Sequence, residues 1–161
     1  MLRRVREEAR VVFLDKTAEQ IVKLLQQNGR MSYVDMASKL EVTEGTVRRR
    51  CHRLIDEGLI NVVGIVDPFK VGLNSLAIIG LNVEPGKFEK AVKEVSAFDE
   101  IKYVAVTTGG TDIVIHGYFQ SNDDLSSFLV DRLAYIEGIT QVNTSLVLDI
   151  CKRSFDWGVG T

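Results

Sequence analysis

The amino-acid sequence predicts an α+β fold, an N-terminal winged helix-turn-helix followed by a ferredoxin-like βαββαβ domain. Three observations support this prediction. A cationic helix around residue 50 follows another short helix across a tight turn. After it, strand and helix patterns come in the order β-α-β-β-α-β. The charge divides between the halves, because residues 1–60 carry 12 Lys and Arg against 9 Asp and Glu, whereas residues 61–161 carry 8 against 13. The basic half is the one expected to face a polyanion.

The chain of 161 residues divides into four segments. Residues 1–13 are rich in helix formers and are expected to form an N-terminal extension, a helix whose role the sequence does not reveal. Residues 14–66 form the predicted DNA-binding domain. The Asp67-Pro68 pair opens a linker over residues 67–75, and residues 76–161 form the second domain.

The first two helices of the DNA-binding domain begin at polar caps. Asp15 follows an apolar residue and opens a helix that ends at Asn28-Gly29. Ser32 and Asp35 form a capping pair that opens the second helix. The apolar residues of these helices are Ile21, Leu24 and Leu25 in the first and Val34, Met36, Ala37 and Leu40 in the second.

Residues 43–57, TEGTVRRRCHRLIDE, form the predicted third helix, with Thr43 as its cap. At about 100° per residue, Val47, Cys51 and Leu54 lie within about 60° of one another and form a buried seam. The opposite side carries Gly45, Arg49, His52 and Asp56, with Arg48 and Arg53 on the flanks. Arg50 lies at the edge of the seam, where it is expected to brace the helix.

A cationic helix face with an anion-binding N-terminus suits the major groove of DNA. Arg49 and His52 are expected nearest the base edges, and Arg48 and Arg53 at phosphates. The alternative to DNA binding is that residues 43–57 form a charged helix that only faces solvent. The apolar segment Val62–Val66 is expected to supply the strand of the wing. The predicted DNA-binding residues are Thr43, Glu44, Gly45, Thr46, Arg48, Arg49, Arg50, His52 and Arg53.

The second domain is predicted from hydrophobic periodicity and turn residues. Four strands are expected, from Leu76 to Val83, at Val104–Val106, from Ile113 to Phe119 and from Gln141 to Leu148, with a turn at Thr108–Thr111 between the second and the third. A first helix, between the first two strands, has the apolar residues Phe88, Ala91, Val92 and Val95. A second helix, between the last two strands, is capped by Asn122 or Asp123 and has Leu125, Phe128, Leu129, Leu133 and Ile136 on its inner face. This fold hosts many functions, so it indicates none by itself.

Five segments carry a resemblance to a known family: LDKTAEQIVKLLQQNGR, MASKLEVTEGTVRRRCHRLIDEGLI, VDPFKVG, VAVTTGGTDIVI and TSLVLDICKRS. In this order they resemble the leucine-responsive regulatory protein / AsnC (Lrp/AsnC) family of bacterial and archaeal transcription regulators, over about residues 14–155. Three departures are mild. Ala18 stands where an acidic residue is usual, Thr43 replaces a serine cap, and Cys51 replaces an aliphatic residue.

The resemblance implies a transcriptional regulator that binds specific double-stranded DNA and whose second domain senses a small-molecule effector, usually an amino acid. It also implies dimers formed through the sheets, which assemble into tetramers or octamers. The effector is expected near a turn matched here by Gly109, Gly110, Thr111 and Asp112. Glycine permits close backbone approach, exposed N–H groups can hold a carboxylate, and Asp112 can accept from an ammonium. The alternative is a plain hairpin that Asp112 caps.

Two other functions compete with a regulator. One is an enzyme similar to sirohaem decarboxylases, and the other is a ligand-binding module without DNA binding. The chain has only two histidines, His52 and His116, and no catalytic or metal-ligand spacing, so no catalytic residues, cofactor or metal are expected. Cys51 and Cys151 form neither a disulfide framework nor a metal motif. With no apolar run of about 20 residues and no secretory signal, the protein is expected in the cytoplasm.

Overall fold

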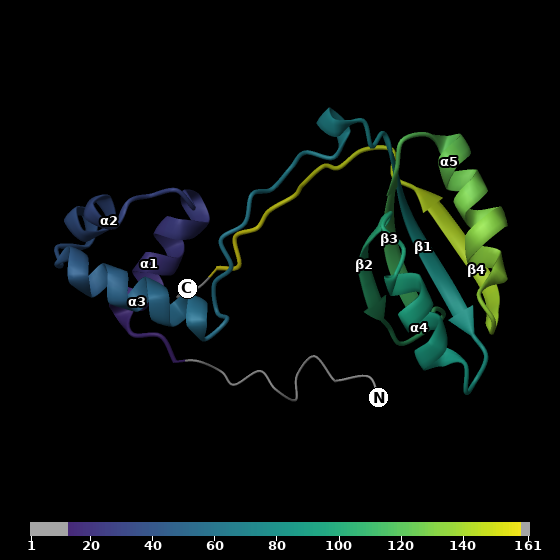
Figure 1. Cartoon of the computed structure of the whole chain (residues 1–161), viewed down its shortest axis with the longest axis horizontal. Helices are drawn as coiled ribbons and strands as arrows, with labels where there is room; N and C mark the ends of the chain where they lie inside the picture. The colour runs from purple at the N-terminus through teal and green to yellow at the C-terminus, as the bar shows by residue number, and fades with distance from the viewer. Residues whose placement is uncertain (1–12, 159–161) are drawn as a thin grey trace. The chain divides into compact units, whose positions relative to one another are not determined.

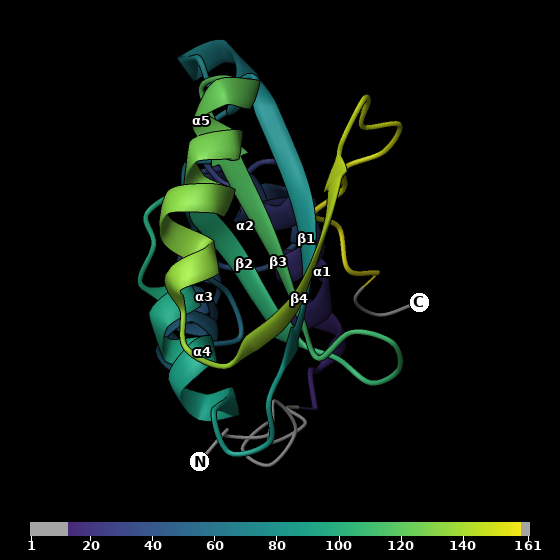
Figure 2. The same cartoon turned by 90° about the vertical axis from the view of Figure 1, so that its right-hand side faces the viewer.

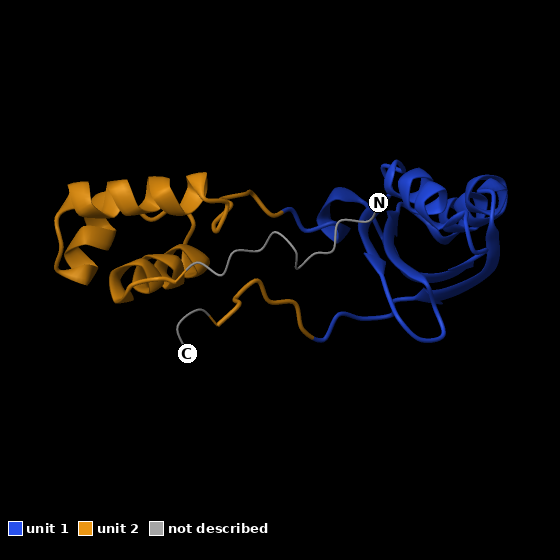
Figure 3. Cartoon of the chain, turned by 90° about the horizontal axis from the view of Figure 1, so that it is seen from below, with its two compact units in different colours: residues 1–3, 66–151 blue, residues 4–65, 152–161 orange. Residues whose placement is uncertain are grey.

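The computed structural model describes residues 13–158, which fall into two compact units (Figure 3). Residues 66–151 form one unit, and residues 13–65 together with 152–158 form the other. The helix predicted over residues 1–13 lies, apart from Phe13, outside the described residues. In the described part of the chain, no helix is long and apolar enough to cross a membrane.

The unit predicted to bind DNA contains three helices, α1 (Lys16–Gln27), α2 (Tyr33–Leu40) and α3 (Glu44–Asp56) (Figure 1). All three predicted caps are confirmed. Asp15 accepts a hydrogen bond from the Ala18 amide at 2.9 Å. Ser32 accepts from Asp35 at 3.1 Å, and Thr43 accepts from Thr46 at 3.3 Å. Each cap pairs one of the N–H groups that a helix start leaves without an intrahelical partner.

The three helices share one apolar core, and the predicted seam of α3 is buried in it. Glu41 takes a left-handed φ of 55° and ends α2, which makes the turn to α3 tight. Val34 differs from the other apolar residues of α2, because its side chain is 60% exposed. The buried members of this core are Ala18, Ile21, Val22, Met36, Ala37, Val47, Cys51 and Leu54.

The strand predicted at Val62–Val66 is wrong, because these residues form no regular secondary structure. Val62, Val63 and Ile65 are all more than half exposed. A strand requires a hydrogen-bonding partner. Within the described residues this segment pairs with no other strand, so its β-rich composition alone does not produce one.

In the second unit the predicted β-α-β-β-α-β order is confirmed. A short 3₁₀ turn, η1 (Phe69–Val71), precedes the domain. The elements are β1 (Ser75–Val83), α4 (Phe88–Ser96), β2 (Ile101–Val106), β3 (Ile113–Phe119), α5 (Asn122–Ser127) with its π-helical and 3₁₀ continuations η2 (Phe128–Arg132) and η3 (Leu133–Tyr135), and β4 (Ile139–Leu146).

Several boundaries in this unit differ from the sequence prediction. Strand β1 begins one residue earlier than predicted, at Ser75, and strand β2 begins three residues earlier, at Ile101. The cap of α5 is Ser121, which accepts a hydrogen bond from the Asp124 amide at 3.1 Å, so neither Asn122 nor Asp123 is the cap. Strand β4 begins and ends two residues before the predicted range. A serine one residue earlier competes well with Asn and Asp for the cap position, and only the backbone geometry selects between them.

The four strands form an antiparallel sheet in the order β2-β3-β1-β4. Helices α4 and α5 lie on the same face of this sheet (Figure 2; Figure 3). Alternate residues of β1 and β3, such as Ile79 and Ile115, are fully buried beneath them. The other face carries Ile78, Tyr103 and His116, and within the described residues of this unit no helix covers it.

Candidate DNA-reading and effector-binding sites

Two arginines of α3 pair with acidic residues one turn away on the same helix. Arg48 donates to Glu44, and Arg53 Nε lies 2.9 Å from Glu57 Oε1. Both pairs are exposed, and such pairs contribute only about 0–1 kcal/mol. A DNA phosphate can therefore replace the carboxylate at little cost, which fits the flanking positions of Arg48 and Arg53.

Arg50 has the bracing position that the helical projection predicted. Its guanidinium donates to Asp15, the cap of α1, and so ties α3 to the start of α1. The Ala18 amide and the Arg50 guanidinium both lower the pKa of Asp15 below its ordinary value. The ion pair therefore links the cap of one helix to the inner edge of another.

Arg49 and His52 lie on the exposed side of α3, together with Gly45. Within the described residues Arg49 has no acidic partner, unlike the other three arginines of the helix. A side chain added at Gly45 would meet nothing within 4 Å, so this end of α3 is open to a close approach. The outer face of α3 thus offers an exposed guanidinium and an imidazole, with paired cations on its flanks.

Tyr33, the first residue of α2, is a part of this surface that the sequence did not reveal. The Arg48 guanidinium lies 5.8 Å from the centre of the Tyr33 ring. The His52 ring meets the same tyrosine edge-on, with centroids 6.3 Å apart. Since Tyr33 reaches these residues only through the packing of α2 on α3, no local spacing in the sequence points to it.

The predicted effector turn closes the β2–β3 hairpin, and hydrogen bonds hold it firmly. The Thr107 amide donates to the Asp112 carbonyl at 2.9 Å, and the Thr107 hydroxyl donates to the Thr111 carbonyl at 2.6 Å. The Asp112 amide donates to the Leu81 carbonyl at 3.0 Å. One carboxylate oxygen of Asp112, Oδ2, accepts from the Val83 amide at 2.9 Å. Asp112 thus ties the end of the turn to strand β1, and within the described residues its other carboxylate oxygen, Oδ1, has no hydrogen-bond partner.

Gly109 and Gly110 lie at the tip of this turn. Gly109 has a φ of 109°, a conformation that side-chain-bearing residues rarely adopt. The Asn82 amide nitrogen donates to the Gly110 carbonyl at 3.0 Å, while Asn82 Oδ1 is buried and has no hydrogen-bond partner in the described residues. Thr111 packs over Gly80, where an added Cβ would come within 2.9 Å of the threonine methyl group. Strand β1 therefore contributes Gly80 and Asn82 to the site, and the sequence identified neither.

His116 lies near the middle of the uncovered sheet face. Its ring lies against Tyr103, with centroids 4.7 Å apart and planes inclined by 33°. Burial lowers the pKa of His116 below its ordinary value. The neutral imidazole therefore behaves as part of an apolar surface.

Both domains match known family models. The model described as Lrp/AsnC ligand binding domain matches residues 76–157, and the model described as winged helix-turn-helix DNA-binding matches residues 14–61. An HTH-type transcriptional regulator of Pyrococcus horikoshii, PH0140, is 34% identical over 151 residues, which cover 93% of each chain. The HTH-type transcriptional regulator Ptr1 of Methanocaldococcus jannaschii is 30% identical over 140 residues, covering 86% of this chain and 95% of Ptr1.

Solved structures agree with these matches. The transcriptional regulator NMB0573 of Neisseria meningitidis, solved as a complex with L-Met, has a TM-score of 0.83 and 26% identity, covering 89% of this chain and 95% of that one. AsnC of E. coli has a TM-score of 0.84, covering 88% and 97% of the two chains. Its identity of 24% supports the shared fold alone.

Proposed function

The chain belongs to the Lrp/AsnC family of DNA-binding transcriptional regulators, and from this premise we propose that it recognises a specific DNA sequence as a homo-oligomer whose DNA binding responds to an amino-acid effector. The observation that carries the proposal is the outer face of α3, where Arg49 is exposed and has no acidic partner among residues 13–158. Because it acts on DNA, we place the regulator in the cytoplasm.

Helix α3 enters the major groove with Arg49 and His52 at the base edges. Arg48 and Arg53 exchange their carboxylate partners for phosphates. Thr43, Glu44, Gly45 and Thr46 bring the helix N-terminus close to the DNA backbone. Arg50, at the edge of the buried seam, positions α3 through its ion pair with Asp15, the cap of α1.

A second copy of the chain covers the open sheet face. This face presents Ile78 at 39% and Tyr103 at 52% exposure, with the largely uncharged His116 between them. Covering apolar side chains contributes roughly 25 cal/mol per Å² of buried area. The resulting dimer brings two DNA-binding units together, and dimers assemble further into tetramers or octamers.

The effector binds at Gly109, Gly110, Thr111 and Asp112. Backbone N–H groups at the glycines hold its carboxylate, and Asp112 Oδ1 accepts from its ammonium. The complex of the relative NMB0573 with L-Met supports an amino acid as the ligand class. We propose no catalytic activity, since His116 faces a tyrosine ring and not the carboxylate that would orient a general base.

A gel-shift experiment with the protein's own upstream DNA tests the proposal. The full chain should retard the fragment, and a pooled amino-acid mixture should change the retardation. Asp112→Asn keeps an oxygen acceptor at the cap but removes the charge, so it should bind DNA normally and lose the response to the mixture. If none of the amino acids changes the retardation of the wild-type complex, the proposal that the effector is an amino acid is wrong. If the protein retards no DNA at low salt, the proposal that it binds DNA is wrong.

A further inference from the structure

Strand β4 forms one edge of the sheet (Figure 2). Its sequence, ITQVNTSL, contains no charged residue and no proline, and every residue after Ile139 is exposed. Within the described residues no strand pairs with its outer side. The unpaired N–H and C=O groups of such an edge bind a further strand unless a charge, a proline, a bulge or a covering segment prevents it. The composition of β4 therefore leaves its edge open to pairing.

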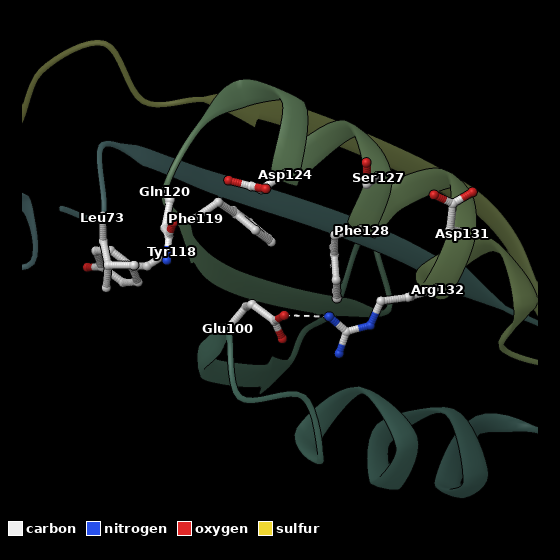
Figure 4. A pocket seen from close by; sticks show the side chains of 10 residues that line it. All are labelled: Leu73, Glu100, Tyr118, Phe119, Gln120, Asp124, Ser127, Phe128, Asp131 and Arg132. Carbon is white, nitrogen blue, oxygen red and sulfur yellow. Dashed lines mark hydrogen bonds and ion pairs between the residues drawn. The ribbon is translucent and has the colours of Figure 1, made fainter.

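The opposite edge of the sheet, strand β2, is protected. Its ladder with β3 shifts register between Ile101 and Tyr103, and Lys102 lies at this shift. At the start of β2, Glu100 accepts a hydrogen bond from Arg132, so the continuation of α5 reaches this end of the strand (Figure 4). A bulge and a lysine are two devices by which proteins prevent pairing at an edge. The two edges of the sheet therefore differ in what they can bind.

Three residues of β4 direct their backbone groups away from the sheet. Just after the strand, the Val147 amide donates to the Leu76 carbonyl of β1 at 2.8 Å. In an antiparallel ladder the N–H and C=O of one residue point to the same side, and the side alternates from residue to residue. The register with β1 is regular over residues 141–146, so the alternation continues along β4. The backbone groups of Leu146, Thr144 and Val142 therefore point outward.

The side chains of these three residues lie on the face of the sheet that the helices cover. Their partners on β1 are fully buried beneath α4 and α5, and these partners are Ala77, Ile79 and Leu81. Val142 and Leu146 are nevertheless 39% and 40% exposed, so the cover of the helices ends before β4. The outward backbone groups thus lie beside two apolar side chains that have room for a further neighbour.

We infer that β4 pairs edge to edge with β4 of a second copy of the chain, antiparallel and centred on Thr144. In this register Thr144 faces the same residue of the second copy, and Val142 and Leu146 face each other on both sides of it. Each of the three residues donates to and accepts from the residue that it faces. A threonine pair then lies between apolar pairs, and no charges meet. The strand fits a copy of itself because a two-fold axis at Thr144 exchanges two apolar positions.

This contact differs from the proposed contact over the open face of the sheet. The two-fold axis of edge pairing is perpendicular to the sheet, whereas the axis that relates two facing sheets lies parallel to them. Two perpendicular two-fold axes can close a tetramer. The β4 edge therefore supplies the step that joins dimers into tetramers. This step rests on the proposed oligomer, although the edge contact itself does not require the open-face contact.

Analytical ultracentrifugation of the full-length chain tests the inference. Thr144→Lys places two like charges at the two-fold axis and should reduce the assembly to about half of the wild-type mass. Thr144 is exposed, so the variant should fold, which circular dichroism checks. Val106→Lys is the matched control, because Val106 is 49% exposed on the same side of the sheet at the β2 edge. This control should keep the wild-type mass.

The outcomes separate this contact from the proposed oligomer as a whole. A monomeric wild type would overturn both. A wild-type oligomer whose mass Thr144→Lys leaves unchanged would overturn the edge contact alone. An equal decrease with Val106→Lys would also overturn it, because the effect of the charge would not be specific to β4.

A charge exchange tests the register and excludes a folding defect. Val142→Lys and Leu146→Glu should each lower the mass as Thr144→Lys does. An equimolar mixture of these two variants should recover the wild-type mass, because the introduced lysine of one copy faces the introduced glutamate of the other. The double variant should recover it for the same reason. If both the mixture and the double variant stay at the lower mass, the inference is wrong, and another segment or partner occupies the edge.

Discussion

Replacing Arg49 by alanine separates DNA recognition from folding. Arg49 is exposed and has no acidic partner among the described residues, so its removal breaks no ion pair there. We expect Arg49→Ala to leave the free energy of unfolding within about 0.5 kcal/mol of wild type. The substitution should instead lower the affinity of the protein for its operator DNA.

The expected loss of DNA affinity follows from the contact that the exposed Arg49 guanidinium can make with a base. A bidentate bond to guanine discriminates against other bases by about 1–3 kcal/mol. At about 1.4 kcal/mol for each factor of ten, this corresponds to roughly 5- to 150-fold weaker binding per DNA-binding unit. Arg53→Ala is the comparison, because Arg53 is already paired with Glu57 and is expected at a phosphate.

The assay is fluorescence anisotropy on the operator and on operators changed at single base pairs, over a range of salt concentrations. Arg49→Ala should weaken operator binding and flatten the preference at one or two base pairs. Arg53→Ala should weaken binding to all sequences alike and lower the salt dependence by about one counterion. If Arg49→Ala weakens all sequences equally, Arg49 is a phosphate contact, and the assignment of the outer face of α3 to base reading is wrong.

Three further predictions test other parts of the structure. Tyr33→Leu should lower operator affinity about two- to fivefold, because the aromatic ring beside Arg48 is lost, and should leave stability unchanged. Tyr33→Phe keeps the ring and should bind the operator as the wild type does. An equal loss of affinity in both variants would show that the ring contact does not contribute to DNA binding. Gly117→Ala brings a Cβ within 2.7 Å of the buried Phe119 ring and should cost roughly 1–3 kcal/mol in urea unfolding, against little change for Gly64→Ala, which meets nothing within 4 Å. Burial lowers the pKa of His116 below about 6.5, so below that pH the unfolded chain binds more protons than the folded one, and stability should fall as the pH decreases from 7 to 5. His116→Gln should flatten this decline, and an unchanged pH profile would show that the imidazole is not held neutral.

The sequence by itself determined the features whose causes lie within a few residues. The caps Asp15, Ser32 and Thr43 bond to amides three residues ahead, so each was readable from spacing alone. The seam of Val47, Cys51 and Leu54 and the edge position of Arg50 followed from the helical period. The order of elements in the second domain followed in the same way, since each helix and strand has its own hydrophobic period.

Only the tertiary structure decided which distant residues meet. The period indicated that Arg50 braces the helix, but only packing supplied Asp15 as its partner. Likewise Tyr33 reaches α3, and Asp112 caps the Val83 amide, across separations that no short-range pattern encodes. The segment Val62–Val66 shows the reverse case, in which composition favours a strand and the described chain supplies no partner. A helix forms its backbone hydrogen bonds within itself, whereas strands and binding sites depend on groups contributed from elsewhere in the fold. Helices and their caps could therefore be predicted from the sequence, and strand pairing and site partners only from the tertiary structure.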